Sequence, residues 1–331
     1  MKRIAIIGGG SWGTALAVIA ARAGHEVRLW SRNAEVLNSI NENRVNSRYL
    51  KFVEIPSSVA ATSELNAALE HAELILFAAP SHAARELFTT ISPHLSDSTI
   101  IVSVAKGIEI ETGKRISEIA KEAIGTTNRF VCLSGPSFAK EVVHGHPTAI
   151  VAASKDAAAA RTVQNDLSFE NLRIYTNTDV IGTEIGGSVK NVMAIAAGMA
   201  VGLGFGSNSV AALITRGLAE ITRFARREGA QVETLMGLAG LGDLVLTCTG
   251  TLSRNRFVGE ELGKGRRLEE ITAELNEVAE GIRTARAVKQ LADRANLEMP
   301  IVNEVNAVLY TRKSARDAVA ELMNRPLREE V

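Results

Sequence analysis

The chain has 331 residues, with 37 Lys and Arg against 37 Asp and Glu, so its formal net charge at neutral pH is zero. This balance argues against a nucleic-acid partner or an anionic membrane surface and favours a small-molecule ligand. The length is typical of two domains, each large enough to bury its own core, and the two cysteines, Cys132 and Cys248, follow no metal-ligand or paired spacing.

Short apolar runs alternate with helical patterns from residue 3 to about residue 175. The strand-like runs are RIAIIG, EVRLW, AELILFAAP, STIIVSVAK, NRFVCLSGP, TAIVAAS and NLRIYTNTDV. This alternation predicts an α/β fold with an N-terminal Rossmann-type, doubly wound parallel sheet that carries helices on both faces. Because the first run begins at Arg3 with no signal peptide before it, we expect a reduced, cytoplasmic protein.

The second half of the chain has a different pattern. From Glu184 onward the strand-like runs stop, and Ala, Leu, Glu and Arg recur at helical spacing. We predict a dinucleotide-binding Rossmann domain over 1–177 and an all-helical substrate-binding and catalytic domain over 178–331. Residues 192–215 carry no charge and are long enough to cross a bilayer. Their glycines favour instead two buried helices joined by a turn, and the same region is a candidate dimer surface.

A glycine-rich motif joins the first strand to the first helix. Gly8, Gly10 and Gly13 fit G-x-G-x-x-G between IAII and SWGTALAVIAARAG. In such a motif the first glycine makes the tight turn, the second lets a pyrophosphate approach, and the third lets helix and strand pack closely. The helix N-terminus favours an anion, with Ser11 and Trp12 beside it. We predict a dinucleotide site; the alternative is a glycine turn without a ligand.

The second strand ends on a basic residue. An NAD-only site usually has Asp or Glu there, whereas an arginine accommodates a 2′-phosphate. This chain has Arg32. We therefore expect NADPH to be accepted at least as well as NADH, and the alternative is an ordinary solvated arginine.

Polar residues follow two later strands, at the sheet edge where open α/β folds bind ligands. Lys106 follows the run STIIVSVA, and Gly135 follows RFVCLS. Ser137 is expected either to cap the next helix or to bind a polar substrate. For Lys106 the alternative is an ordinary surface lysine.

Lys190 lies in a run of Gly, Ala and Val whose other members are predicted to be buried. A buried lysine is costly without a partner, and its pKa falls readily, which suits a general base. Asn191 is placed to orient it. If Lys106 shares the same cleft, repulsion lowers both pKa values further. The alternative is a lysine that reaches the surface along an apolar helix.

A last stretch combines a carboxylate with a basic cluster. Asp243 follows GLAGLG and can accept a hydrogen bond from a substrate hydroxyl. Ser253, Arg254 and Asn255 supply the donors that bind a phosphate dianion, although an arginine in a helical region is often only a surface residue. No cluster of residues in the sequence indicates a metal site.

Together these stretches resemble the bacterial NAD(P)-dependent sn-glycerol-3-phosphate dehydrogenases over essentially the full chain. The motifs are GGGSWGTALA, VAKG, SGPSFAKE, GGSVKNVMAIAAGMAVGLGFGSN, ALITRGLAE, GLAGLGDLVLTCTGTLSRNR, VAEGIRTA and MPIVNEV. Relatives often have Ala or Thr where this chain has Ser188. The resemblance implies that Lys190 is the proton acceptor. It implies as substrate ligands Lys106, Gly135, Ser137, Lys190, Asp243, Ser253, Arg254 and Asn255. It implies as NAD(P)H contacts Ser11, Trp12, Arg32, Tyr49, Lys106, Ala139, Arg254, Val278 and Glu280.

The implied reaction interconverts dihydroxyacetone phosphate and glycerol 3-phosphate, the backbone precursor of glycerophospholipids, with NADP(H) or NAD(H) and no metal. The resemblance also suggests a homodimer. One alternative is a related hydroxyacid dehydrogenase or ketopantoate reductase, which SRNR argues against because a carboxylate substrate needs no phosphate cluster. Another is a sensor that binds NAD(P) without turnover, which has no use for a buried Lys190.

Overall fold

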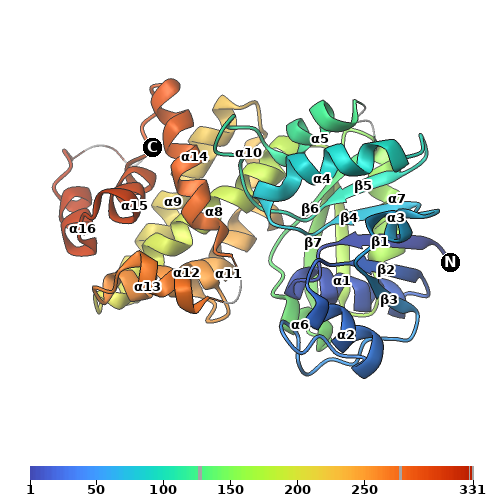
Figure 1. Ribbon diagram of the computed structural model, residues 1–331. Helices are drawn as coiled ribbons and strands as arrows, with labels where there is room; N and C mark the ends of the chain where they lie inside the picture. The colour runs from blue at the N-terminus through green and yellow to red at the C-terminus, as the bar shows by residue number, and fades with distance from the viewer. Residues whose placement is uncertain (126–128, 276–277, 328, 330–331) are drawn as a thin grey trace. The chain divides into compact units, whose positions relative to one another are not determined.

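The computed structural model describes residues 1–125, 129–275, 278–327 and 329. The chain forms two compact units. The first comprises Met1–Lys106 and Lys114–Glu184, and the second comprises Gly107–Gly113 and Ile185–Val331. Among the described residues all strands belong to the first, the sheet unit, and the second is the helical unit (Figure 1).

The sheet unit is built on one eight-stranded sheet. Its strands are β1 (Arg3–Ile7), β2 (Glu26–Trp30), β3 (Val59–Thr62), β4 (Leu74–Phe77), β5 (Ile100–Ser103), β6 (Phe130–Ser134), β7 (Thr148–Ala153) and β8 (Leu172–Asn177). Their spatial order is β3-β2-β1-β4-β5-β6-β7-β8. The order reverses between β1 and β4, the point at which open α/β sheets bind ligands beyond the carboxyl ends of their strands. The predicted Rossmann-type class is confirmed.

Two details of the sheet differ from the sequence prediction. The strand β3 was not predicted, because VAAT contains two alanines and too few β-branched residues to stand out. The sheet is also not wholly parallel, since β7 pairs with β6 in the antiparallel direction. The helix between them, α6 (Ala139–Val143), has only five residues. It is therefore too short to carry the chain back along a full strand, as a parallel crossover requires.

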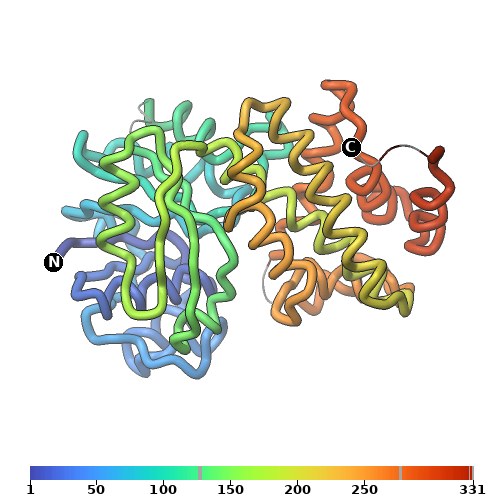
Figure 2. Tube along the Cα trace, turned by 180° about the vertical axis from the view of Figure 1, so that it is seen from behind, coloured from blue at the N-terminus to red at the C-terminus, as the bar shows by residue number. Residues whose placement is uncertain are grey.

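Helices flank the sheet. They are α1 (Ser11–Arg22), α2 (Ala34–Asn43), α3 (Leu65–Leu69), α4 (Ala84–Ile91), α5 (Ile116–Ile124), α6 and α7 (Ala157–Leu167), with the short 3₁₀ turns η1 (Ser81–Ala83) and η2 (Ser92–His94). Helix α1 contacts α6 and α7, whereas α4 contacts α5. Figure 2 shows α7 and β8, in yellow-green, on the side turned away from the viewer in Figure 1. Because α1 is covered on all sides, its residues from Gly13 to Ala21 are all buried.

The helical unit follows. Its helices are α8 (Val180–Gly202), which begins within the residues of the sheet unit, α9 (Ser207–Arg227), α10 (Val232–Met236), the π-helical turn η3 (Leu238–Gly242), α11 (Asp243–Thr249), α12 (Arg254–Gly263), α13 (Leu268–Glu274), α14 (Glu280–Arg294), α15 (Pro300–Thr311) and α16 (Ala315–Met323). Among the described residues α8 alone is long and apolar enough to cross a membrane. Most of it is buried, as in the core helix of a soluble protein.

Helices α8 and α12 touch through their backbones. A Cβ added at Gly198 of α8 would lie 2.0 Å from the carbonyl oxygen of Arg256, and one added at Gly259 of α12 would lie 2.0 Å from that of Ile195. Only glycine permits so close an approach of two backbones. These glycines therefore set the distance between α8, which carries Lys190, and the start of α12.

The prediction of two buried helices over 192–215 is correct for α8 and wrong for the beginning of α9. Ala211, Ala212 and Thr215 are exposed, and Phe205 in the preceding turn is 40% exposed. The buried residues of α9 begin at Gly217 and recur with helical spacing. Because the first two turns of α9 are uncharged all round, the sequence pattern could not reveal which face meets solvent.

Candidate active site

The glycine-rich turn has the geometry of a dinucleotide cradle. Gly8 has φ +126°, and a Cβ there would lie 2.7 Å from the backbone of Ala78. A Cβ at Gly13 would lie 2.0 Å from the carbonyl oxygen of Gly8, which confirms the close packing of helix and strand. At Gly10, the N-cap of α1, a Cβ would meet nothing within 4 Å. The space beside the helix N-terminus fits a pyrophosphate, which the positive end of the helix dipole would favour.

A buried asparagine that the sequence did not single out supports this turn. Asn46 is fully buried, and its Nδ2 donates to the carbonyl oxygen of Gly9 (3.0 Å) and to Thr14 Oγ1 (2.8 Å). Its Oδ1 accepts from the backbone N–H of Tyr49 (3.2 Å), whose carbonyl oxygen accepts from Ser11 Oγ (3.1 Å). Asn46 lies more than thirty residues after the motif in the sequence, so only the tertiary contact reveals its role.

Arg32 is exposed beyond the end of β2, with its guanidinium carbon 5.9 Å from the ring centroid of Trp30. The next residue, Asn33, caps α2 by accepting a hydrogen bond from the N–H of Val36 (3.2 Å). Trp12 and Tyr49 are half-buried and pack against the core of the sheet unit. The sheet unit therefore presents Ser11 and Trp12 from the start of α1, Arg32 from just beyond β2, and Tyr49 from the segment after α2.

The carboxyl ends of β5 and β6 bring three predicted residues together. Lys106 Nζ and Ser137 Oγ both donate to the carbonyl oxygen of Gly135, each at 3.0 Å. Gly135 has φ +143°, and a Cβ there would lie 2.9 Å from Ile150 Cα, so the position requires glycine. The capping interpretation of Ser137 is wrong. Helix α6 begins at Ala139 and its N-cap is Phe138, because the chain stays extended for one more residue.

In the helical unit the buried lysine has a carboxylate partner. Lys190 is 5% exposed and Asp243 is 1% exposed. The ammonium donates to Asp243 Oδ1, and it also donates to Thr247 Oγ1 at 2.7 Å. The carboxylate stabilises the charged ammonium against the cost of burial. The alternative of a lysine that reaches the surface is therefore wrong.

Thr247 is a site residue that sequence analysis missed. Its hydroxyl donates to the carbonyl oxygen of Asp243 at 2.6 Å, one helical turn earlier in α11. The signal was present, because residues four apart on a helix share a face and Asp243 was already a candidate. Asp243 and Thr247 together form one polar face of α11 toward Lys190.

An asparagine pair joins three helices near Lys190. Asn255 Nδ2 donates to Asn191 Oδ1 (3.0 Å), and the N–H of Gly281 donates to Asn255 Oδ1 (3.0 Å), so the pair links α8, α12 and α14. Ser253 is the N-cap of α12 and accepts from the N–H of Arg256 (3.2 Å). An N-terminal turn of this kind favours an anion.

Three further predicted contacts lie beside that turn. Arg254, the first residue of α12, donates to the carbonyl oxygen of Val278 (3.4 Å). Val278 is 42% exposed, and Glu280 is the first residue of α14. The helical unit thus gathers its predicted residues around the start of α12 and the buried pair formed by Lys190 and Asp243.

The sequence matches known proteins over its whole length. The family models described as NAD-dependent glycerol-3-phosphate dehydrogenase N-terminus and C-terminus match residues 3–160 and 179–320. A glycerol-3-phosphate dehydrogenase (NAD(P)+) from Koribacter versatilis is 53% identical over 335 residues, covering 100% of this chain and 99% of the relative. The chain belongs to the NAD-dependent glycerol-3-phosphate dehydrogenase family.

Other members of this family are also similar to this chain over nearly its full length. The enzyme of that name from Listeria innocua is 46% identical, covering 98% of this chain and 96% of its own. The crystal structure of glycerol-3-phosphate dehydrogenase from Coxiella burnetii has a TM-score of 0.95 at 40% identity, covering 98% of this chain and 99% of that one. A D-mandelate dehydrogenase (TM-score 0.63, 15% identity) shares the fold alone. The resemblance inferred from the motifs is confirmed.

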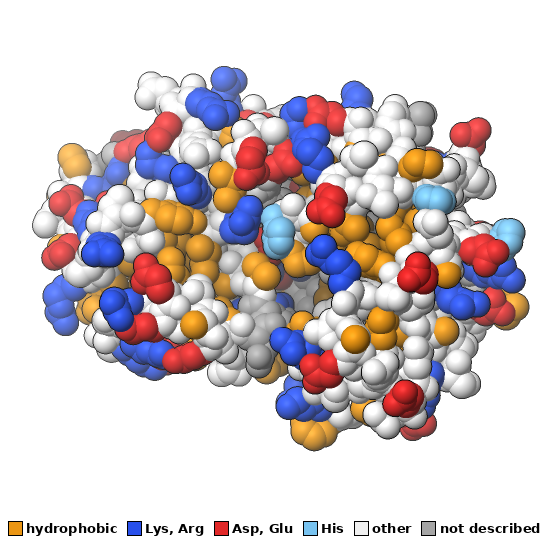
Figure 3. Space-filling model, in the orientation of Figure 1, with side chains coloured by type: hydrophobic (Ala, Val, Ile, Leu, Met, Phe, Trp, Pro, Cys, Tyr) orange, Lys and Arg blue, Asp and Glu red, His pale blue; other side chains and the backbone are white. Residues whose placement is uncertain are grey.

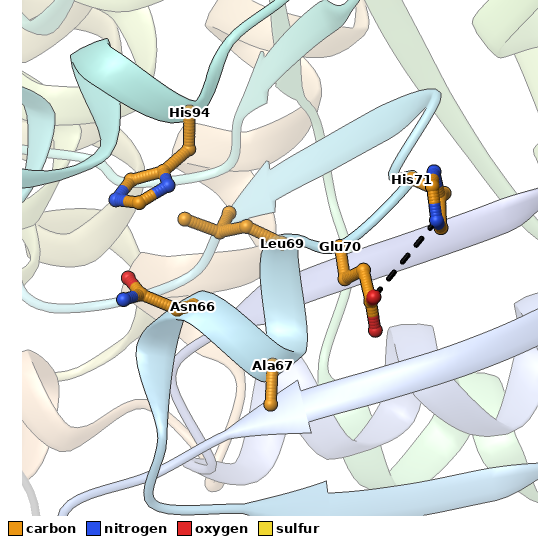
Figure 4. Close-up of a pocket in the computed structure, with 6 residues that line it drawn as sticks. All are labelled: Asn66, Ala67, Leu69, Glu70, His71 and His94. Carbon is orange, nitrogen blue, oxygen red and sulfur yellow. Dashed lines mark ion pairs between the residues drawn. The ribbon is translucent and has the colours of Figure 1, made fainter.

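In this dehydrogenase family member a further cavity, of about 430 Å³, lies away from the candidate site (Figure 4). It is lined by Asn66, Ala67, Leu69, Glu70, His71 and His94. These residues precede β4 and β5, so the cavity is at the amino ends of the strands, opposite the glycine-rich turn. None of the predicted site residues lines it. Among the described residues no group of three or more His, Cys, Asp or Glu could hold a metal ion.

The surface of this dehydrogenase carries mixed charges (Figure 3), and its two thiols are buried. Basic and acidic side chains are interspersed over the face in Figure 3. Both cysteines are buried and unpaired. Burial raises the pKa of Cys132 well above its usual value and that of Cys248, near Lys190 and Asp243, to about 12. Both therefore remain thiols at neutral pH, and neither is a nucleophile.

Proposed function

We propose that the protein is an oxidoreductase that interconverts dihydroxyacetone phosphate and sn-glycerol 3-phosphate with NADP(H) or NAD(H). One observation carries the proposal. In a chain that belongs to this family over its full length, a lysine and an aspartate form a buried ion pair in the helical unit. A buried charged pair is an expensive structural element, which a reaction that moves a proton can use.

Lys190 is the proposed proton carrier. In the reducing direction C2 of the ketone would receive the hydride that a dihydronicotinamide supplies when bound, and Lys190 Nζ would give a proton to the carbonyl oxygen, which becomes the hydroxyl. In the reverse direction the neutral amine takes that proton back. Asp243 stabilises the ammonium, and Thr247 Oγ1, at 2.7 Å from Nζ, orients it.

The substrate phosphate is proposed to bind at the start of α12. The positive end of the α12 dipole and the guanidinium of Arg254 favour binding of a dianion. Binding the phosphate away from the reacting carbon orients that carbon, so that loss of this contact lowers the rate as well as the affinity. The proposed substrate ligands are Lys106, Gly135, Ser137, Lys190, Asp243, Ser253, Arg254 and Asn255.

The cofactor is proposed to bind along the carboxyl edge of the sheet. The open space at Gly10 supports a pyrophosphate on α1, and Arg32 supports acceptance of the 2′-phosphate. The proposed cofactor contacts are Gly8, Gly10, Ser11, Trp12, Gly13, Arg32, Tyr49, Lys106, Ala139, Arg254, Val278 and Glu280. Residues 1–177 would then be the dinucleotide-binding domain and residues 178–331 the substrate and catalytic domain.

The proposed function also has a cellular location, an oligomeric state and a metabolic role. It works in the cytoplasm as a homodimer and supplies glycerol 3-phosphate for glycerophospholipid synthesis. The uncharged, exposed first turns of α9 support a protein contact, since a second copy would cover Ala211, Ala212 and Phe205. Sedimentation at graded concentrations tests the dimer, and a strictly monomeric protein would contradict it.

The decisive experiment follows absorbance of the reduced cofactor with dihydroxyacetone phosphate, using NADPH and then NADH. We compare wild type with Lys190→Met and, as the control, with Lys264→Ala, which removes an exposed lysine paired with Glu261. Lys190→Met is expected to lose about 10³-fold or more in kcat and to keep its cofactor affinity. Absence of wild-type turnover with either cofactor would refute the proposed substrate, and 2-oxo acids would be tried next.

A further inference from the structure

A segment outside the glycine motif is attached to the cofactor end of α1. Asn46 donates to the carbonyl oxygen of Gly9 (3.0 Å), and Ser11 Oγ donates to the carbonyl oxygen of Tyr49 (3.1 Å). Ser11 is the first residue of α1, the helix whose N-terminus fits the pyrophosphate. Arg48 is one of the two residues between these anchors, Asn46 and Tyr49, so its backbone is fixed beside the proposed cofactor site.

Arg48 presents its guanidinium on that surface. The guanidinium carbon lies 5.5 Å from the ring centroid of Tyr49, and Nε donates to the Tyr49 hydroxyl at 3.1 Å. A terminal guanidinium nitrogen donates to the carboxylate of Glu35 at 3.2 Å. The two side chains are 36% and 60% exposed. So exposed an ion pair contributes little, and a dianion can replace the carboxylate as the partner of Arg48.

Glu35 lies at the corner where dinucleotide folds bind the adenosine ribose. It is in the first turn of α2, three residues after Arg32, which follows the end of β2. At this corner a carboxylate accepts hydrogen bonds from the ribose hydroxyls of NAD, and an arginine binds the 2′-phosphate of NADP. The ion pair of Arg48 and Glu35 therefore contains both a group that binds a 2′-phosphate and a group that accepts from ribose hydroxyls.

We propose that Arg48 and Glu35 are cofactor-specificity residues with opposite preferences. Arg48 joins Arg32 on the 2′-phosphate of NADP(H), which then has two guanidinium partners. Glu35, once released from Arg48, accepts hydrogen bonds from the ribose hydroxyls of NAD(H). This inference rests on the proposed function, because it divides the proposed cofactor site between the two cofactors.

The test measures the dissociation constants of NADP+ and of NAD+ by isothermal titration calorimetry with the full-length protein in low-salt buffer. Arg48→Ala is expected to raise the Kd for NADP+ about tenfold and to leave that for NAD+ within about twofold. Glu35→Gln is expected to lower the Kd for NADP+ about two- to fivefold and to raise the Kd for NAD+. The control Arg161→Ala removes an exposed arginine from α7 and is expected to change neither.

Other results separate the inference from the proposed function. Equal weakening of both cofactors by Arg48→Ala would assign Arg48 to support of Tyr49 only and overturn the inference. Unchanged NADP+ affinity in Arg48→Ala, with loss in Arg32→Ala, would overturn it and leave the proposed function standing. If wild type bound neither cofactor, both would fail. Arg48→Lys keeps the charge without the planar fork, so an intermediate NADP+ affinity is expected.

Discussion

The buried pair of Lys190 and Asp243 allows a sharp test, because removing one partner differs from removing both. Lys190 is 5% exposed and Asp243 1%, so neither can reach water without a rearrangement. Lys190→Met leaves the buried carboxylate without its ammonium, and Asp243→Leu leaves the buried ammonium without its carboxylate. Each is expected to cost about 3–5 kcal/mol. The double variant replaces the pair by apolar groups and is expected to lie within about 2 kcal/mol of wild type.

The contacts of Thr247 support the small cost expected for the double variant. Thr247 loses the ammonium in the double variant, but its hydroxyl still donates to the carbonyl oxygen of residue 243 at 2.6 Å, so this buried donor stays satisfied. Guanidinium chloride unfolding, followed by far-ultraviolet circular dichroism, measures the four free energies. A matched cycle on the exposed pair of Arg267 and Glu270 is expected to lower the free energy of unfolding far less in every variant. If the two buried substitutions proved additive, the reasoning would be refuted.

Three further outcomes are expected. Gly198→Ala forces α8 and α12 apart and is expected to lower the free energy of unfolding by about 1–3 kcal/mol. Gly206→Ala, whose Cβ would meet nothing within 4 Å, serves as the control. Equal melting temperatures of these two variants would contradict the backbone contact between α8 and α12. Burial raises the pKa of Glu220 to about 7 from 4.5, against the hydrogen bonds it accepts from α15, so its contribution to stability is complete below pH 4.5 and is lost as pH rises through 7. Unfolding free energies are expected to fall over that interval in wild type and less steeply in Glu220→Gln, and parallel slopes would argue against the assignment. Cys132 and Cys248 are expected to react with a thiol reagent only after unfolding, and a fast native reaction at either would show that its burial is transient.

Much of the fold followed from local pattern. Alternating apolar runs predicted the doubly wound sheet, since strands buried on both faces are nearly continuous in Val, Ile and Leu. Local pattern could not predict the direction of β7, which depends on how far α6 can carry the chain. It also missed β3, whose residues have little strand preference of their own.

The candidate site also has features that local pattern predicts and features that it does not predict. Local pattern was enough to locate the residues that carry chemistry, because Gly8, Gly13 and Lys190 are unusual at their positions for reasons of backbone geometry and burial. Which of these groups contact one another depends on how the elements pack in three dimensions. Asp243 follows Lys190 by 53 residues and Asn46 follows Gly9 by 37, and such pairs form only when separate elements pack. Contacts of this range arise from the packing of whole helices and strands, and no periodicity within a single element encodes them.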